Sequence, residues 1–349
     1  MQLDLVHTWT WIRHSIEKAE GLDALRLTQE RMTGVTERWA SRGMLTLEIF
    51  EYLNVWHDLL MHRALDFTLQ ELEKKGLGTP PAPFCWLLLG SGGRREQTLH
   101  PDQDNALVYR SLAADEQGRT QERAFFQALG EQGVATLEQI GYPYCSGFVM
   151  AANERWNGSL EKWQEQLQRY ADFPDWSNAR FLMIASDLRP LYGDVSLAAE
   201  LHQWVVANVP QMAFIKWQVA DHGLAHKIGL DFRERFRTEL WGEHERELNI
   251  KDGGYLQLVN ATRLWAVAHG IVETHTGSRI AKIMESKLWR EEDGNDIQAA
   301  YETLLSLRLW SNYTCPERLS VQERERLKAA LRTIRSLQKR TAKRFTKPK

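Results

Sequence analysis

The sequence contains little cysteine. Its 349 residues include three cysteines, Cys85, Cys145 and Cys315, which are widely spaced and form no Cys-x-x-Cys pair. So few and so scattered thiols argue against a disulfide framework and against a structural zinc site. They fit a protein of a reducing compartment.

The chain also lacks a long apolar segment. No run approaches the roughly 18 apolar residues that a membrane-spanning helix needs. The first twenty residues, MQLDLVHTWTWIRHSIEKAE, have neither the basic start nor the apolar stretch of a signal peptide. We therefore expect a cytoplasmic protein without a membrane partner.

Neither sign of charge predominates. The 44 Lys and Arg against 46 Asp and Glu give a formal net charge of −2, so no overall field draws the protein to nucleic acid. The local exception is the segment from Arg324 onward, which is rich in Lys and Arg and has Glu325 as its one acid. We expect a solvated helix face with a basic end there, and nucleic acid is the less favoured partner.

The chain is long enough for two or three domains with cores of their own. Apolar residues recur at spacings of three and four from about residue 8 to 76, which predicts helices that end at Lys74, Lys75 and Gly76. The prolines of GLGTPPAP then break any helix. We expect a helical region over 1–80, a core over 81–195 and a C-terminal helical substrate-binding domain with a basic tail over 196–349.

Strands and helices alternate within the predicted core, which is typical of an α+β fold. Strands are predicted at FCWLLLG (84–90), NALVY (105–109) and YPYCSGFVMA (142–151), and helices over 115–141 and 159–173. Beyond residue 196 the pattern is mostly helical, with interruptions predicted at 249–258 and 290–298. His222 and His226 have helical spacing, but Gly223 replaces the Glu of a zinc-protease motif, so no zinc is expected.

One stretch, WLLLGSGGRREQTLHPDQDNALVY (86–109), contains residues that a turn does not need. A glycine-rich turn lets backbone N–H groups approach phosphate oxygens closely. We expect Asp102 and Asp104 to open the second strand. On a strand they point to the same face, about 6.5 Å apart, which suits carboxylates that hold one or two Mg²⁺ ions. Ser91 can add a hydroxyl, and Arg94 and Arg95 can add positive charge.

Other phosphate and metal motifs do not fit this spacing. The Gly-Lys pair of a P-loop is absent, Arg95 stands where a dinucleotide fingerprint has its third glycine, and Leu107 stands where an EF-hand loop has glycine. The simpler alternative is that Asp102 and Asp104 cap a solvated turn after Pro101.

The stretch resembles the motif of the nucleotidyltransferase fold of DNA polymerase β type, in which Gly-[Gly/Ser] is followed about ten residues later by Asp-x-Asp. More narrowly, it is similar to a family of nucleotidyltransferases related to the protein-PII uridylyltransferase GlnD and often fused to CBS and cyclic-nucleotide-binding modules. The resemblance continues through GYPYCSGFVMAANERW, SDLRPLYGD and LNIKDGGYLQLVNATRLWAVAHGI, over about residues 30–310. The residues that fall on the motif are Gly90, Ser91, Arg94, Glu96, Gln97, Asp102, Gln103, Asp104 and Asn105.

The resemblance implies a mixed-sheet core flanked by helical regions. It implies a transfer, dependent on Mg²⁺ (or Mn²⁺), of a nucleoside monophosphate from ATP or UTP to an acceptor hydroxyl, most simply on a protein in a regulatory pathway. Asp102 and Asp104 are then the catalytic and metal-binding residues. The nucleotide-binding residues are Gly90, Ser91, Gly92, Arg94, Glu96 and, in an element that also resembles an ordinary surface turn, Lys251.

The resemblance also leaves an alternative open. The fold commonly supplies a third carboxylate from a later strand, and here YCSGFVMAAN has none, so Asn153 or Asp187 would have to serve. The structural interpretation of Asp187, which we favour, is an Asp–Arg pair that fixes the sheet edge. The alternative function is a nucleotide-binding regulatory module with weak or no catalysis.

Overall fold

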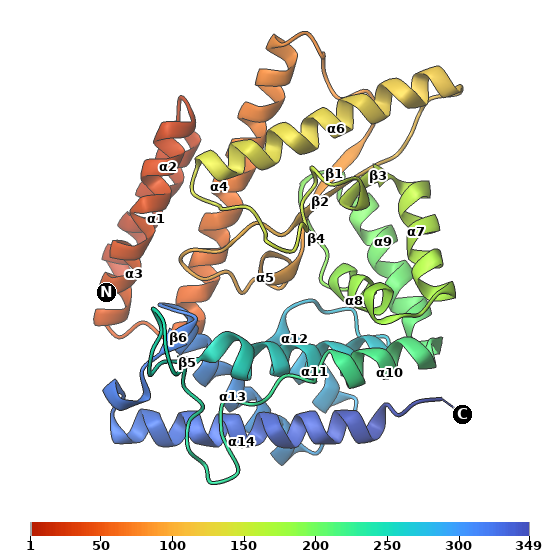
Figure 1. Cartoon of the computed structure of the whole chain (residues 1–349). Coiled ribbons are helices and arrows are strands. Elements are labelled where there is room, and N and C mark those ends of the chain that lie inside the picture. The colour runs from red at the N-terminus through yellow and green to blue at the C-terminus, as the bar shows by residue number, and fades with distance from the viewer. Residues whose placement is uncertain (1, 349) are drawn as a thin grey trace. The chain divides into compact units, whose positions relative to one another are not determined.

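The computed structural model describes residues 2–348 (Figure 1). Their contacts divide the chain into two compact units. Unit 1 comprises Met1–Gln166 and Asp187–His202, and unit 2 comprises Leu167–Ser186 and Gln203–Lys349. The predicted motif therefore lies wholly in unit 1.

Unit 1 begins with the predicted helices. They are α1 (Gln2–Glu17), α2 (Leu22–Glu30), α3 (Met32–Ser41) and α4 (Thr46–Lys74). The end of α4 is confirmed as predicted, because Lys75 caps it and Gly76 follows at φ +84°, the left-handed conformation that glycine adopts without a steric cost.

A mixed four-stranded sheet forms the centre of unit 1, which confirms the predicted α+β class. Its strands are β1 (Phe84–Leu88), β2 (Asn105–Tyr109), β3 (Asn157–Ser159) and β4 (Arg189–Gly193), in the order β3-β2-β1-β4. β1 is antiparallel to β2 and β4, whereas β2 is parallel to β3.

The register brings distant parts of the chain to one edge of this sheet. Leu88, at the end of β1, pairs with Asn105 at the start of β2 and with Arg189 at the start of β4. The segments that follow Leu88 and precede Asn105 and Arg189 therefore meet there. We call this end of the sheet the glycine edge.

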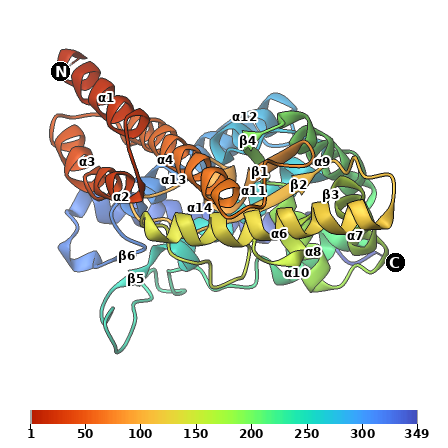
Figure 2. The ribbon, with the colours of Figure 1, turned by 90° about the horizontal axis from the view of Figure 1, so that it is seen from above.

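Helix α6 (Glu116–Gln139) packs against α4 and against strands β2 and β3 (Figure 2). Gly133 permits this approach, because a Cβ there would lie 2.7 Å from the Trp86 ring. Tyr109 stacks on Phe126 with the ring centroids 4.1 Å apart. Since β1 and β2 are buried along their whole length, the sheet is a rigid base for the glycine edge.

Three predicted elements differ in the structure. Residues 142–151 form no strand, because Pro143 and a turn at 146–147 interrupt the extended run. Residues 290–298, predicted as an interruption, instead begin α13 (Glu291–Arg308), whose acidic first turn suits a helix start. The glycine cluster forms one helical turn, α5 (Gly90–Gly93).

Unit 2 is largely helical, as predicted beyond residue 196. Helix α11 (Leu256–Ala268) is buried nearly throughout and packs against its neighbours α10 (Ala213–His222), α12 (Thr276–Glu285) and α14 (Val321–Arg344). The predicted break at 249–258 contains short β5 (Leu248–Asn249) and a π-helix, η3 (Lys251–Tyr255). α10 ends at His222, so His222 and His226 do not share a helix face.

The remaining elements of the chain follow. They are η1 (Glu154–Trp156), α7 (Leu160–Asp172), α8 (Trp176–Ala185), α9 (Val195–Asn208), η2 (Val209–Gln211), β6 (Tyr313–Thr314) and η4 (Pro316–Arg318). Across the described residues 2–348, every helix is too short or too polar to cross a membrane.

Candidate functional site

The structure brings the two parts of the predicted motif into contact at the glycine edge. Gly90 follows extended Leu89 at φ +50° and opens the single turn α5. A Cβ at Gly90 would lie 2.0 Å from Oδ2 of Asp104. Because no side chain fits into that space, glycine is required for this close approach of the Asp104 carboxylate to the backbone.

The Asp-x-Asp segment was predicted to lie on a strand. It lies just before the strand instead, since β2 begins at Asn105. The Leu89 N–H donates to the Asp104 carbonyl (2.9 Å) and extends the ladder by one step. Burial alternates through the segment: Asp102 and Asp104 are half-buried, whereas Gln103 is buried. Both carboxylates therefore belong to the more open side of an extended chain.

The neighbours of Asp104 hold a second segment in place. The Gln103 N–H donates to the Pro143 carbonyl and the Asn105 N–H to the Val149 carbonyl, both at 3.0 Å. We call residues 143–149 the clamped loop, because its two ends are bonded to the residues on either side of Asp104. The apolar run predicted as a strand is this loop.

The side-chain amide groups of Gln103 and Asn105 add further hydrogen bonds. Gln103 Nε2 donates to the carbonyls of Val134 (3.0 Å) and Tyr142 (2.8 Å), and Asn105 Oδ1 accepts from the Ala151 N–H (2.8 Å). Asn105 Nδ2 also donates to Gln103 Oε1 (3.0 Å). Because both side chains are buried and bonded, the loop position is fixed by the motif itself.

Within the clamped loop, Cys145 contacts the site directly. Its thiol is hydrogen-bonded to the Asp104 carboxylate, and burial, followed by the charge of Asp104, raises the pKa of Cys145 to about 11. At neutral pH the thiol is therefore protonated and donates to Asp104.

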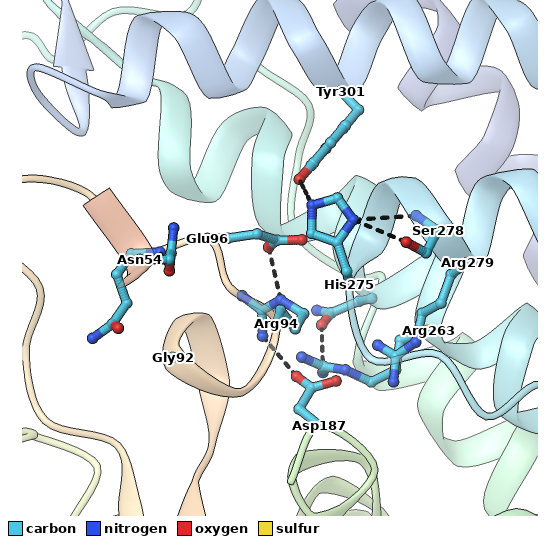
Figure 3. A network of polar contacts seen from close by, with 12 residues as sticks. Asn54, Gly92, Arg94, Glu96, Asp187, Arg263, His275, Ser278, Arg279 and Tyr301 are labelled. Atoms are coloured by element: carbon cyan, nitrogen blue, oxygen red, sulfur yellow. Dashed lines mark hydrogen bonds and ion pairs between the residues drawn. The ribbon is translucent and has the colours of Figure 1, made fainter. Parts of the chain in front are cut away.

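A buried cluster of charged side chains is centred on Arg94, the residue that follows α5. Arg94 donates through Nε to Glu96 (2.8 Å) and through Nη1 to Asp187 (2.6 Å), as Figure 3 shows. The three side chains are 4%, 0% and 0% exposed. Gly93 permits the approach of this segment, since a Cβ there would lie 2.0 Å from the Asp187 carbonyl oxygen.

This cluster contains three residues that the sequence analysis considered for the site. Arg94 and Glu96, predicted to contact the nucleotide, are inside unit 1 and bonded to each other. Asp187, a candidate for the third carboxylate, is bonded to Arg94, in keeping with its alternative interpretation as the acid of an Asp–Arg pair. The other candidate, Asn153, caps η1 by accepting from the Arg155 N–H (3.0 Å).

Two further contacts fasten α5 to α4. Arg189 donates to both carboxylate oxygens of Asp58 at 2.9 and 2.8 Å, and to the Gly92 carbonyl at 2.9 Å. Arg95, at φ +57°, keeps a side chain that is 51% exposed. Burial lowers the pKa of Arg95, and the charge of Arg189 lowers it further. The Arg95 side chain nevertheless stays cationic near neutral pH.

An uncharged histidine supports the same region from α4. His57 is fully buried, with Nε2 3.0 Å from the Thr98 carbonyl and Nδ1 2.8 Å from the Tyr142 hydroxyl. Burial lowers the pKa of His57 to about 4. The neutral ring thus donates to Thr98 and accepts from Tyr142, next to the clamped loop.

The remaining predicted site residues are Ser91 and Lys251. Ser91 is half-buried at the glycine edge, and its carbonyl accepts from the Glu96 N–H (2.8 Å). Lys251 belongs to unit 2, where it opens the π-helix η3 with a half-buried side chain.

Unit 2 contains a partly buried polar network that the sequence did not reveal. His275 caps α12 by accepting from the Ser278 N–H (3.2 Å), and its other ring nitrogen lies 3.2 Å from the Tyr301 hydroxyl (Figure 3). Arg279, 1% exposed, donates to the carbonyls of Glu273 (2.7 Å) and Ser186 (2.9 Å). No local spacing signals the bond between Arg279 and Ser186, because the two residues are far apart in sequence.

Among residues 2–348, no group of three or more His, Cys, Asp or Glu side chains is arranged to hold a metal ion. A cavity of about 760 Å³ in unit 1 lies near the opposite end of β2, beside Tyr109 and Ser111. None of the predicted site residues lines it. The site at the glycine edge is therefore a surface with two carboxylates and a glycine turn.

The mixed sheet, with its glycine–aspartate contact, is consistent with a nucleotidyltransferase-like domain. Residues 30–176 match the family described as "Putative nucleotidyltransferase DUF294", and residues 214–345 match the "Putative nucleotidyltransferase substrate binding domain". The chain therefore contains a nucleotidyltransferase domain of this family and its substrate-binding C-terminal domain. No curated protein matches the sequence.

Proposed function

We propose that the protein transfers a nucleoside monophosphate from ATP or UTP to an acceptor hydroxyl, with Mg²⁺ or Mn²⁺ as the metal. The observation that carries the proposal is the contact between Gly90 and Asp104, which leaves no room for a Cβ. A carboxylate held against a glycine backbone can present a metal ion to a phosphate that approaches the same backbone.

The donor set at the glycine edge fits a metal that arrives with its nucleotide. Magnesium usually keeps one or two carboxylates and takes its other ligands from substrate phosphates and water. Asp102 and Asp104 would supply the carboxylates. A bound metal would neutralise charge on the triphosphate and on the departing pyrophosphate.

The transfer itself is a substitution at the α-phosphorus. The acceptor oxygen forms a bond to the phosphorus, the bond to the bridging oxygen breaks, and pyrophosphate leaves with that electron pair. The hydroxyl proton passes to water or to a carboxylate of the site. Positioning and charge neutralisation supply most of the rate enhancement in such a step.

The other residues have supporting parts in this proposal. Gly90, Ser91 and Gly92 would accommodate the triphosphate, and Arg95 offers an exposed positive charge beside them. The burial of Arg94 and Glu96 favours a positioning role, in which they hold the turn that carries the nucleotide contacts. Lys251 is proposed as a nucleotide contact from unit 2.

The resemblance of the motif to protein-PII uridylyltransferases supports a protein acceptor and a regulatory role. The small number of scattered cysteines supports a location in the cytoplasm.

A second candidate function is a nucleotide-binding regulatory module with weak or no catalysis. It is favoured by the bond between Asp187 and Arg94 (2.6 Å), because Asp187, the candidate for the third carboxylate, is already paired with Arg94. With two acids, a site would bind the metal–nucleotide complex but stabilise the transition state less.

The experiment that tests both candidates uses ATP and UTP labelled at the α-phosphate, with Mg²⁺ or Mn²⁺ and a cell lysate. We expect label to appear on a protein with the wild type, and not with the Asp102→Asn/Asp104→Asn variant. Asp172→Asn, an exposed change on α7, is the matched control. Nucleotide binding by calorimetry without label transfer would support the second candidate, and the absence of both would refute the two together.

A further inference from the structure

We infer that Tyr144 and Phe148 of the clamped loop form a stacking platform for the base of the nucleotide. The inference rests on the proposed function and names the residues that would bind the part of the substrate farthest from the phosphates. Its starting point is the position of two exposed rings next to a carboxylate of the site.

The loop is a turn whose geometry is fixed. The Phe148 N–H donates to the Cys145 carbonyl (3.0 Å), and the Gly147 N–H donates to Cys145 Sγ (3.3 Å). The carbonyls of Pro143 and Val149 accept from residues 103 and 105. Tyr144 and Phe148 are each one residue inside these anchors, so they flank the point where Cys145 touches Asp104.

Both rings are exposed although their backbone is anchored. Tyr144 is 54% and Phe148 69% exposed. Exposure of one aromatic ring is ordinary in a loop. Two rings within five residues, on a loop bonded to both sides of Asp104, present flat apolar surface at a defined place beside the site.

Phe148 is also strained. Its φ of +57° lies in the left-handed region, which a bulky side chain adopts at a cost of roughly 1–2 kcal/mol. Such strain persists only where the surrounding structure determines it, and it is concentrated at binding sites. Here the bond from Asn105 to the neighbouring Val149 (3.0 Å) holds the conformation.

The chemistry of the platform selects a flat, uncharged ligand. Asp102 and Asp104 repel bare phosphates, and the clamped loop offers no cation to attract them, because the residues at 143–149 carry none. Any nucleobase can stack its flat face on an aromatic ring, whichever polar groups stand at the edge of the base. The triphosphate at the glycine turn and the base on the rings would therefore lie on either side of Asp104.

The test compares Mg·ATP with the magnesium complex of inorganic tripolyphosphate, which has the phosphates and no base. Affinities are measured by calorimetry for the wild type, for Tyr144→Ala/Phe148→Asn and for Tyr144→Phe/Phe148→Tyr. Asparagine removes the ring yet tolerates the left-handed conformation. Phe173→Asn, which removes a ring that is 67% exposed in unit 2, is the matched control.

We expect Tyr144→Ala/Phe148→Asn to bind Mg·ATP on the order of tenfold more weakly, in keeping with the loss of one stacked base. Its affinity for tripolyphosphate should be unchanged. The aromatic exchange keeps two flat rings and should lose less ATP affinity than Tyr144→Ala/Phe148→Asn, and Phe173→Asn should behave as the wild type. Unaltered ATP affinity would overturn the inference, as would an equal loss for ATP and tripolyphosphate.

The same experiment separates this inference from the proposed function. If the wild type bound no nucleoside triphosphate, both would fail. If ATP binding were unaltered in the variant while label transfer to the acceptor fell, the rings would contact the acceptor and the base platform alone would be refuted.

Discussion

Two groups of charged side chains lie at the glycine edge of unit 1, and the fold treats them differently. Arg94, Glu96 and Asp187 are buried and bonded to one another. Asp102 and Asp104 are half-buried on the open side of an extended segment. A buried charge is tolerated only with partners, whereas a half-buried carboxylate can also be approached by a ligand from the solvent. We therefore propose that the first group serves stability and that the second binds the ligand.

The largest effect is expected from breaking the buried group. Arg94→Met removes a cation that is bonded to two buried carboxylates, which should lower the free energy of unfolding by about 3–5 kcal/mol. Arg95→Met, at the exposed neighbour, should change it by less than about 1 kcal/mol. Chemical denaturation measures both, and equal losses would refute the distinction between the two groups.

Removing one charge from the open group should reduce activity strongly and stability little. Asp104→Asn should reduce label transfer on the order of 10²–10³-fold, because charge that develops on the phosphates loses its compensation. The unfolding midpoint should fall little. A loss of stability as large as that of Arg94→Met would place Asp104 with the buried group.

The contact between turn and carboxylate is tested by Gly90→Ala. The added Cβ would overlap Asp104 Oδ2 and displace it, so nucleotide binding should fall on the order of tenfold, in addition to about 1 kcal/mol of backbone strain. Gly78→Ala is the control, since Gly78 has φ +79° and no atom within 4 Å of the added Cβ. If the two variants bind nucleotide equally, the close approach has no functional role.

The smallest effect concerns His57, a buried titratable group that is uncharged. Its folded pKa of about 4 lies below the ordinary histidine value of 6.5, so below pH 6.5 the unfolded chain binds the proton first. The stability that depends on neutral His57 is present above pH 6.5 and is lost as the pH falls towards 4. The gap in unfolding free energy between wild type and His57→Gln should narrow by about 2 kcal/mol from pH 7 to pH 5.

That measurement needs the variant at both pH values, because other groups titrate equally in the two proteins. A gap that stays constant would mean that His57 is not held neutral by burial.

The sequence predicted the elements with strong periodicity or an uninterrupted apolar run. The helices predicted over about residues 8–76, strands β1 and β2 and helix α6 are confirmed. Strands β3 and β4 were missed, because Asn-Gly-Ser and Arg-Pro-Leu-Tyr-Gly lack the alternation of a typical strand. The run at 142–151 has strand-like composition, but the side chains of Gln103 and Asn105 take up bonds that a neighbouring strand would otherwise make.

The site was predicted only in its local part. Glycine and aspartate could be associated because their spacing is a motif within one stretch of chain. The bonds of Arg94 to Asp187 and of Arg189 to Asp58 join residues that are far apart in sequence. Single-sequence patterns contain no signal for such pairs, so the burial of Arg94 and Glu96 became evident only from the fold.

The two backbone bonds of the clamped loop have a consequence for its dynamics. The backbone N–H groups of Gln103 and Asn105 donate to the clamped loop. Their hydrogens can exchange with solvent deuterium only when these bonds break and the loop opens. Their exchange rates therefore report the free energy of opening next to Asp104. A ligand that rests on both the loop and the carboxylate would slow these two amides together.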